Sequence, residues 1–118
     1  MITKKEVLDY VNDAYDTKPA YIFKKFPDYC VLKHTSNGKW YGIIMNVPEV
    51  KLGINGTAEN YVIDLKVQKE LVGLLQSKKG IFPAYHMNKE HWISVDLDIY
   101  ENFKELKGLI DESYDLTS

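Results

Sequence analysis

The residues best suited to chemistry are concentrated between positions 83 and 92. This stretch, PAYHMNKEHW, holds two of the three histidines, an amide, an ammonium and an indole: His86, His91, Asn88, Lys89 and Trp92. Histidine exchanges protons near neutral pH and is a common metal ligand. Lysine attracts phosphate, and an exposed tryptophan offers a face on which a base can stack. The chemistry to be weighed is therefore metal binding, acid–base catalysis or nucleic-acid contact.

Metal binding and catalysis both lack partners in the sequence. A turn over residues 87–90 would place His86 opposite His91, where the two could share a metal. No third ligand with suitable spacing lies nearby, and strand periodicity puts His91 on the core side. A catalytic histidine needs a nucleophile or a pocket, and no Ser-His-Asp order, activated cysteine or paired catalytic carboxylates accompany it. We therefore expect a protein that is not an enzyme and that holds no metal or cofactor.

Asn88 and Lys89 can be interpreted in two ways. As a turn pair, Asn88 would tolerate left-handed backbone geometry and Lys89 would simply be solvated. As the tip of a loop, Lys89 would contact a phosphate while Trp92 stacks on a base or sugar. Both interpretations stay open at the level of sequence.

Charge is distributed unevenly along the 118 residues, although the net charge is only −2. Residues 1–89 carry 13 Lys and 9 acidic residues, net +4, whereas residues 90–118 carry 2 Lys and 8 acidic residues, net −6. All fifteen basic residues are lysine, so the bidentate arginine contacts that most often read guanine are absent. Contact with DNA should therefore be modest and salt-sensitive, and sequence-specific recognition is weakened.

Size and composition predict one ordinary globular domain over residues 1–118, because 45% of the residues are hydrophobic. The start of the chain has no apolar signal segment, and no apolar run approaches the roughly 18 residues needed to cross a bilayer. We expect a cytoplasmic monomer without membrane contact. The lone Cys30, in the segment YCVL, is expected to be a small buried hydrophobe.

Three helices are predicted from capping residues and apolar spacing. Thr3 and Glu6 form a capping box that opens a helix over residues 3–15. A second helix without a good cap is expected over residues 68–79, followed by Gly80 as its stop. Its inward stripe would be Leu71, Val72, Leu74 and Leu75. Asn102, with Glu105 three residues later, caps a third helix whose inward residues would be Phe103, Leu106, Leu109, Ile110 and Tyr114.

The clearest strand signal is Asn37-Gly38, a favoured two-residue turn between two alternating apolar segments. Such a turn would pair Leu32 with Ile43 and Val31 with Ile44. In that register the core face holds Cys30, Leu32, Tyr41, Ile43 and Met45. The opposite face holds Val31, Lys33, Trp40 and Ile44.

Two further strand segments complete the predicted sheet. A second hairpin is expected around Asn55-Gly56, from a strand over Val50, Leu52 and Ile54 to a return strand over residues 61–67. Another strand follows Trp92, which falls on its wet face. The order of elements predicts an α+β fold, an antiparallel sheet with helices packed on one face. The uncovered face would gather Trp40, Trp92, Val31, Ile44, Val62, Lys33, Lys66, Asp64 and Asp96, unless a loop or residues 47–60 cover it.

The motif Tyr85-His86-Met87-Asn88-Lys89 with its trailing His91-Trp92 resembles the MmcQ/YjbR family of small bacterial proteins. The strand ending Val95-Asp96-Leu97, the helix segment LIDESY, the Phe26-Pro27 turn and the Gly38-Lys39 hairpin agree with the family layout, so the resemblance covers nearly the whole chain. It implies a frataxin-like (CyaY-like) α+β fold and a role in DNA binding.

With this resemblance we predict a small non-enzymatic DNA-binding protein. The expected nucleic-acid-binding residues are His86, Asn88, Lys89, Trp92, Lys33, Lys39 and Trp40. The frataxin-like kinship implies an alternative, a module that binds a protein partner or a metal through the exposed sheet face or the acidic C-terminal segment. The acids concerned are Asp96, Asp98, Glu101, Glu105, Asp111, Glu112 and Asp115.

Overall fold

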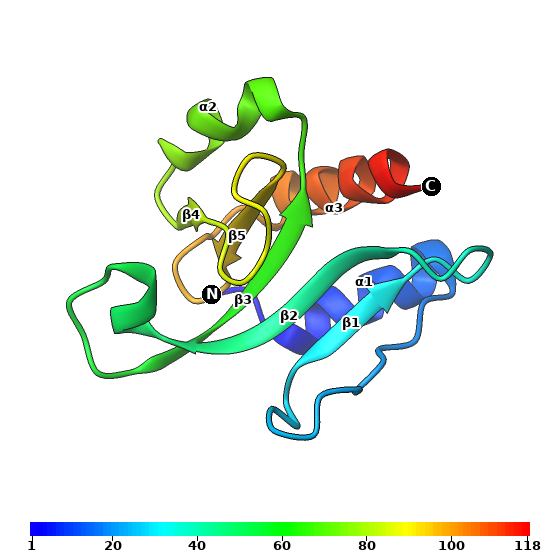
Figure 1. The fold of residues 1–118 in the computed structure, drawn as a ribbon, viewed down its shortest axis with the longest axis horizontal. Helices are drawn as coiled ribbons and strands as arrows, with labels where there is room; N and C mark the ends of the chain where they lie inside the picture. The colour runs from blue at the N-terminus through cyan, green and yellow to red at the C-terminus, as the bar shows by residue number, and fades with distance from the viewer.

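A computed structural model of residues 1–118 shows a five-stranded antiparallel sheet in the order β1-β2-β3-β5-β4 (Figure 1). The strands are β1 (Cys30–Lys33), β2 (Trp40–Pro48), β3 (Glu59–Lys66), β4 (Ile81–Pro83) and β5 (Trp92–Asp96). The helices are α1 (Lys4–Tyr15), α2 (Val72–Gln76) and α3 (Phe103–Thr117), with short 3-10 helices η1 (Glu49–Leu52) and η2 (Lys69–Leu71). The predicted α+β class is confirmed, while the frataxin-like label stays a prediction.

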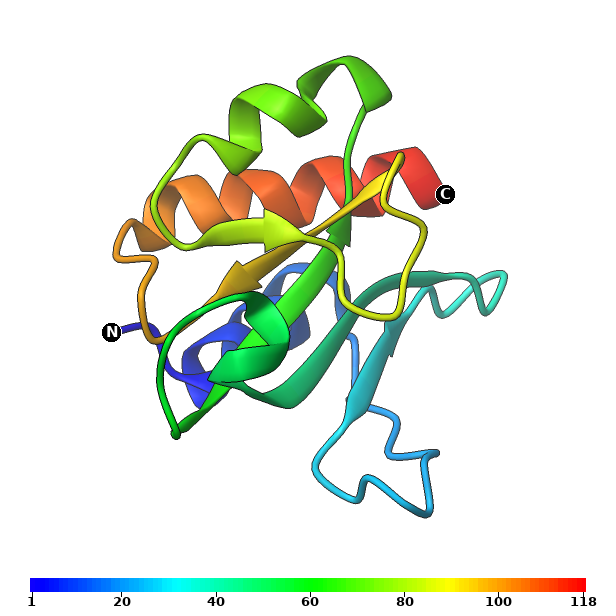
Figure 2. The ribbon, with the colours of Figure 1, turned by 60° about the vertical axis from the view of Figure 1, so that its left-hand side comes forward.

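Helices α1 and α3 pack on one face of the sheet, called here the helix face (Figure 2). The capping box predicted for α1 is present: the Thr3 side chain accepts from the backbone N–H of Glu6, and the Glu6 carboxylate accepts from that of Thr3. The cap predicted for α3 is also confirmed, with Asn102 accepting from the Glu105 N–H. Both helices bury an apolar stripe. No helix of the fold combines the length and the hydrophobicity that a membrane span requires.

A single serine fixes α3 onto two strands. The Ser113 hydroxyl is fully buried, donates to the backbone carbonyl of Tyr41 in β2 and accepts from the backbone N–H of Lys66 in β3. Both backbone groups lie where the β2–β3 ladder ends, so the hydroxyl replaces partners that the sheet no longer supplies. The position of α3 relative to the sheet is therefore set by hydrogen bonds as well as by apolar packing.

The β1–β2 hairpin forms, but the predicted register is wrong by one residue. Val31 pairs with Ile43 and Leu32 with Gly42, whereas Lys33 pairs with Trp40. The turn closes between His34 and Lys39, where the His34 N–H donates to the Lys39 carbonyl. The connection is therefore longer than the predicted two-residue turn. Tyr41 is consequently an extra residue on β2, as in a β-bulge, and the faces of the strand change at this point.

The shift in register exchanges the faces of three predicted residues. Ile44, predicted to face water, lies in the core on the helix face with Cys30 and Leu32. Ile43 and Met45, predicted to be in that core, pack on the opposite face of the sheet. A one-residue slip has this effect because side chains alternate between faces along a strand.

The second predicted hairpin has the expected return strand but a different first strand. β2 itself pairs with β3, with Ile44 opposite Ile63, and residues 49–58 form the connection. Within that connection Glu49–Leu52 is a 3-10 helix, so the predicted strand over Val50, Leu52 and Ile54 is wrong. The Glu49 carboxylate accepts from the Ala58 N–H and holds the connection closed.

The predicted second helix is also shorter than expected. The span 68–79 contains η2 and the five-residue α2, with no side-chain cap and with Gly73 inside the helical turn. Glycine lowers helix stability, and an uncapped N-terminus leaves backbone N–H groups without partners. Leu74 is 66% exposed and Leu71 is 40% exposed, so the prediction that both face inward is wrong.

The face opposite the helices, called here the outer face, is covered by the chain itself. Val31, Val62, Asp64 and Asp96, predicted to face water, are fully buried. Val31, Ile43, Met45, Val47 and Val62 form an outer cluster with Tyr29 and Leu52. Residues 20–29, 52–54 and 85–87 pack over this cluster, so the alternative of a covered face is confirmed. An open face would have left these apolar side chains in water, at a cost of about 1.5–3 kcal/mol for each large one.

Candidate functional site

The loop between β4 and β5, residues 84–91, crosses the outer face and is fastened there by a buried serine. The backbone N–H of Tyr85 donates to the Ser94 hydroxyl at 2.8 Å, and that hydroxyl donates to Oδ1 of Asp64. Asp64 and Ser94 are opposite each other in the β3–β5 ladder, and neither is exposed. The first residues of the motif Tyr85–Lys89 are thus held through Ser94 by a carboxyl group under the loop.

Asp64 is a buried carboxyl group with an incomplete set of partners. Its Oδ2 atom has no hydrogen-bond partner. Burial raises the pKa of Asp64 to about 8, although the Ser94 hydrogen bond and the positive charge of Lys89 act in the opposite direction. Desolvation dominates because a lone carboxylate loses its water shell and receives only one hydroxyl in exchange.

The tip of the loop is a turn built by Asn88. Its Oδ1 accepts from the Glu90 N–H at 2.8 Å, and its carbonyl accepts from the N–H groups of His91 and Trp92. Asn88 is therefore a turn residue, as in an Asx turn, but it does not adopt the left-handed geometry that this interpretation offered. His86 adopts a left-handed φ of 67°, which is uncommon for a residue other than glycine, and its ring packs 3.9 Å from that of Tyr85.

Beside the loop lies an apolar hollow of about 210 Å³, called here the aromatic groove. It is lined by Phe23, Phe26, Tyr29, Trp40, Ile43, Met45, His86 and Met87. Phe23 and Trp40 meet edge to face at 6.2 Å, and Phe26 stacks on Tyr29 at 4.6 Å. Phe26 remains 47% exposed, so this side of the groove is open to solvent. Walls of this kind accept flat, apolar or aromatic groups.

Lysines accompany the segment that supplies half of the residues lining the groove. Residues 23–40 contain four lysines (Lys24, Lys25, Lys33 and Lys39) and one acidic residue, Asp28, a net charge of +3. Lys33 pairs with Trp40 across the β1–β2 ladder, and Lys39 precedes Trp40 in the chain. None of these four forms an ion pair. A ligand with a flat ring and a negative charge therefore finds both complements in one region.

The predicted site residues are divided among different surfaces. Trp40 and His86 are brought together in the aromatic groove. Lys89 lies instead beside a second hollow of about 310 Å³, which is lined by Lys51, Leu52, Gly53, Phe82, Pro83, Ala84, Tyr85 and Lys89. Trp92 is half-buried, pairs with Lys66 and lines neither hollow. Trp40, His86, Lys89 and Trp92 thus all lie on the outer face, but no single hollow is lined by all four, so one small ligand could not contact them together.

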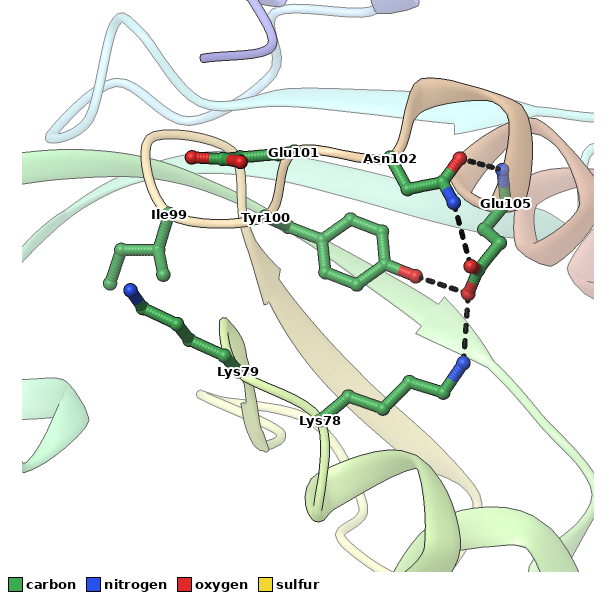
Figure 3. A pocket seen from close by; sticks show the side chains of 7 residues that line it. All are labelled: Lys78, Lys79, Ile99, Tyr100, Glu101, Asn102 and Glu105. Atoms are coloured by element: carbon green, nitrogen blue, oxygen red, sulfur yellow. Dashed lines mark hydrogen bonds and ion pairs between the residues drawn. The ribbon is translucent and has the colours of Figure 1, made fainter.

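The largest hollow, about 450 Å³, lies between the end of α2 and the start of α3 and is lined by Lys78, Lys79, Ile99, Tyr100, Glu101, Asn102 and Glu105 (Figure 3). At its centre the Glu105 carboxylate accepts from Lys78 at 2.8 Å and from the Tyr100 hydroxyl at 2.9 Å. Asn102 donates to its other oxygen. The lysine and the tyrosine hold the pKa of Glu105 below its ordinary value. Because both oxygens of the Glu105 carboxylate are already hydrogen-bonded, we interpret this network as a clamp between α2 and α3.

Several acids of the alternative metal or partner site have internal partners. Asp96 is buried and accepts from Asn60 and from the Asp98 N–H. Asp111 accepts from the hydroxyls of Tyr10 and Tyr15. No group of three or more His, Cys, Asp or Glu side chains is placed to hold a metal ion.

Sequence reasoning missed most of the groove. Phe23, Phe26 and Tyr29 come from an irregular segment between α1 and β1, with only the bridge from Ala20 to Val31 as regular structure. Their spacing of three residues does not match the strand period of two, and Pro27 argues against a helix, so the main signal was the concentration of four aromatic residues in nine positions, 21–29. Asp64 was missed for another reason, since strand alternation placed it on a face that was expected to be wet.

Together these features define a small α+β protein with helices on one face of an antiparallel sheet and a groove on the other. The chain belongs to the YjbR family, whose family model matches residues 13–116. It is 43% identical over 117 residues to the uncharacterized protein YyaQ of Bacillus subtilis, with 99% of each chain covered. It is 30% identical over 92 residues to the uncharacterized protein YjbR of Escherichia coli K12, covering 73% of this chain and 78% of that one. The resemblance to the MmcQ/YjbR family is thereby confirmed.

Solved structures show the same architecture. A crystal structure of a Pseudomonas syringae protein, 51% identical, matches with a TM-score of 0.96 and covers 99% of this chain and 100% of its own. A Deinococcus radiodurans protein described by the family-model domain DUF419 matches with a TM-score of 0.72 at 22% identity, covering 98% of this chain and 78% of that one. The second likeness supports the fold alone.

Proposed function

We propose that this protein is a non-catalytic DNA-binding protein that takes an unpaired base into the aromatic groove. The observation that carries the proposal is the groove itself, in which Trp40, Phe23 and His86 surround an apolar space of about 210 Å³. Stacking on aromatic side chains is the usual way in which proteins hold single-stranded nucleic acid, and it tolerates any base.

Charge around the groove supports the same function. Residues 23–40, which supply half of the residues lining the groove, have a net charge of +3, whereas the whole chain carries −2. The lysines of this segment are Lys24, Lys25, Lys33 and Lys39. Phosphates are therefore attracted locally and not by the molecule as a whole. If four lysines each neutralise one phosphate, the affinity for a single strand should fall on the order of 50-fold between 50 and 200 mM salt.

The remaining predicted residues have more distant roles in this proposal. Lys89 lies on the far side of the 84–91 loop, beside the second hollow, where it could contact a phosphate one or more nucleotides away from the stacked base. Asn88 holds the turn that presents Lys89. Trp92 stands two strands away from Trp40 and lines neither hollow, so this proposal assigns it no stacked base.

The direct test uses Trp40 as its own reporter. In Trp92→Phe the only remaining tryptophan lines the groove, and titration with short single-stranded DNA should quench its fluorescence. Duplex DNA of the same sequence should quench it less, because its bases are stacked on each other. Lys33→Ala and Lys89→Ala should weaken binding and its salt dependence, whereas the matched control Lys104→Ala, an exposed lysine of α3 on the helix face, should not. Unchanged fluorescence in a folded protein at low salt would exclude the groove as a base site.

A second candidate function, binding of a protein partner, is favoured by the apolar residues beside the groove. Tyr21 and Ile22 are each about half exposed and come directly before Phe23, which lines the groove. Exposed apolar residues with a polar rim are typical of interaction sites. Partner binding predicts a complex that Tyr21→Ser or Ile22→Ser weakens and that salt affects little, in contrast to DNA binding.

A further inference from the structure

The buried carboxyl group of Asp64 lies directly below the 84–91 loop and has one acceptor atom to spare. Asp64 is fully buried, its Oδ1 accepts from Ser94, and its Oδ2 has no partner. Nothing in DNA binding requires such a group. A buried polar atom without a partner is uncommon in folded proteins and calls for a physical reason.

The charged groups near Asp64 come from only some of the elements packed around it. Its neighbour in β2 is Ile43, and the β4 residue opposite Ser94 is Phe82, so neither adjacent strand position brings a charge. Along β3 and β5 the nearest charged positions on the same face are Lys66 and Asp96. The loop adds the titratable or charged residues Tyr85, His86, Lys89, Glu90 and His91. The other segments over the outer face, residues 20–29 and 49–54, add Tyr21, Lys24, Lys25, Asp28, Tyr29, Glu49 and Lys51. Of all these, Lys89 is the charged side chain whose field acts on Asp64.

The Lys89 side chain has no partner that would hold it in place. Its side chain is exposed, and it forms no hydrogen bond or ion pair, whereas the neighbouring Glu90 pairs with Lys69 at 3.6 Å. It sits on a loop without regular secondary structure, on a flexible four-carbon stem with three rotatable donors. The 84–91 loop is tied to the sheet at Tyr85 and turned by Asn88, so Lys89 lies at its free end.

We propose that Asp64 and Lys89 form a proton-controlled latch for the 84–91 loop. While the carboxyl group is protonated it is neutral, and Lys89 stays in solvent as the structure shows. When the carboxyl loses its proton to solvent, Lys89 moves inward and donates to the vacant Oδ2, so that the buried negative charge acquires a partner. The alternative, an ionised carboxyl left unpaired in the sheet, is expensive enough to favour the movement.

The latch changes state between neutral and mildly alkaline pH, and it acts on one wall of the aromatic groove. Since burial raises the pKa of Asp64 to about 8, the proton is lost between neutral and mildly alkaline pH. His86 and Met87, on the same loop, form one wall of the aromatic groove. Inward movement of Lys89 therefore alters that wall, whether the groove binds DNA or another ligand, and the proposal stands independently of DNA binding.

The experiment is an NMR titration of the whole chain from pH 5 to pH 10 without ligand. The side-chain carboxyl carbon of Asp64 and the backbone amides of residues 84–91 are followed together. We expect the carboxyl to titrate near pH 8, and the amides of Tyr85, Lys89 and their neighbours to shift with the same midpoint. Histidine protonation also shifts these amides, but that phase is retained in Asp64→Asn, whereas the carboxyl phase should be lost.

Lys89→Gln supplies the specific control. It removes the charge that stabilises ionised Asp64, so the carboxyl midpoint should rise. The amides of Lys89 and Glu90 should no longer follow it, whereas the Tyr85 amide, which is linked to Asp64 through Ser94, still should. Lys51→Gln, an exposed lysine beside the same hollow, should leave both unchanged. The proposal is overturned if the loop amides are insensitive to ionisation of Asp64, or if Lys89→Gln behaves as wild type. Should Asp64→Asn fail to fold, the proposal is still tested by comparing the carboxyl and amide midpoints of the wild type with those of Lys89→Gln.

Discussion

The strongest quantitative prediction concerns the dependence of stability on pH in Asp64→Asn. Asparagine has the shape of the protonated carboxyl group and can still accept from Ser94, but it never ionises. Burial raises the pKa of Asp64 to about 8 in the folded protein, whereas an aspartate in an unfolded chain has a pKa near 4. Between these values the folded state holds a proton that the unfolded state has lost.

The sign and size of the effect follow directly. Because the folded state binds more protons, the free energy of unfolding of the wild type falls as pH rises, by about 1.4 kcal/mol per pH unit. From pH 5 to pH 8 the loss amounts to about 3.5 kcal/mol, a large part of a typical domain stability. Above pH 8 both states are ionised and the contribution becomes constant. Asp64→Asn should lack this decline, and other titrating groups cancel in the comparison.

Urea denaturation of wild type and Asp64→Asn at pH 5, 6, 7 and 8 measures the difference. The two free energies of unfolding should be similar at pH 5 and diverge steadily in favour of Asp64→Asn towards pH 8. Asp115→Asn, an exposed carboxylate near the end of α3, serves as the matched control and should run parallel to wild type. Parallel curves for Asp64→Asn as well would show that the carboxyl is ionised in the folded protein at neutral pH, contrary to its burial.

Three further changes test the fold around the site. Glu105→Gln breaks the contact with Lys78, so the melting temperature should fall. Since the pKa of Glu105 is lowered, its contribution is present above the ordinary pKa of a glutamate, and the difference from wild type should vanish as pH falls through the lowered pKa. Gly80→Ala should destabilise by about 1–3 kcal/mol in thermal or urea unfolding, because Gly80 has a φ of 95° and an added Cβ would approach the backbone of Tyr100 at 3.0 Å. Ser113→Ala leaves backbone groups of β2 and β3 without partners and should cost about 1–3 kcal/mol, with faster amide exchange where these strands meet α3.

Local chemistry made the ends of the helices predictable. Thr3 and Asn102 are capping residues whose effect depends only on the next three positions, and both act as the sequence indicates. These caps need no knowledge of the rest of the fold, which is why one sequence sufficed. Gly80 has the expected positive φ, but α2 already ends at Gln76, so the prediction that Gly80 stops this helix is wrong.

The sheet faces could not be predicted because they depend on distant partners. A single extra residue at Tyr41 moved Ile43, Ile44 and Met45 to the opposite sides. The outer face looked wet because Asp64 alternates with apolar residues, and only the fold shows that residues 20–29 and 84–91 cover it. The aromatic groove follows from that covering. Of the predicted site residues, Trp40 and His86 meet in it, while Lys89 and Trp92 do not.

The central claim, that the aromatic groove holds a DNA base, is tested most directly by comparing two tryptophan substitutions. The affinity for a labelled single-stranded oligonucleotide would be measured by fluorescence anisotropy at 50 mM salt for wild type, Trp40→Leu and Trp92→Leu, each verified as folded. Loss of one stacked base is worth about 1–3 kcal/mol, so Trp40→Leu should bind roughly 5- to 150-fold more weakly. Trp92→Leu, outside the groove, should bind within a few-fold of wild type. Equal affinities for Trp40→Leu and wild type, or no binding by any of the three, would contradict the claim.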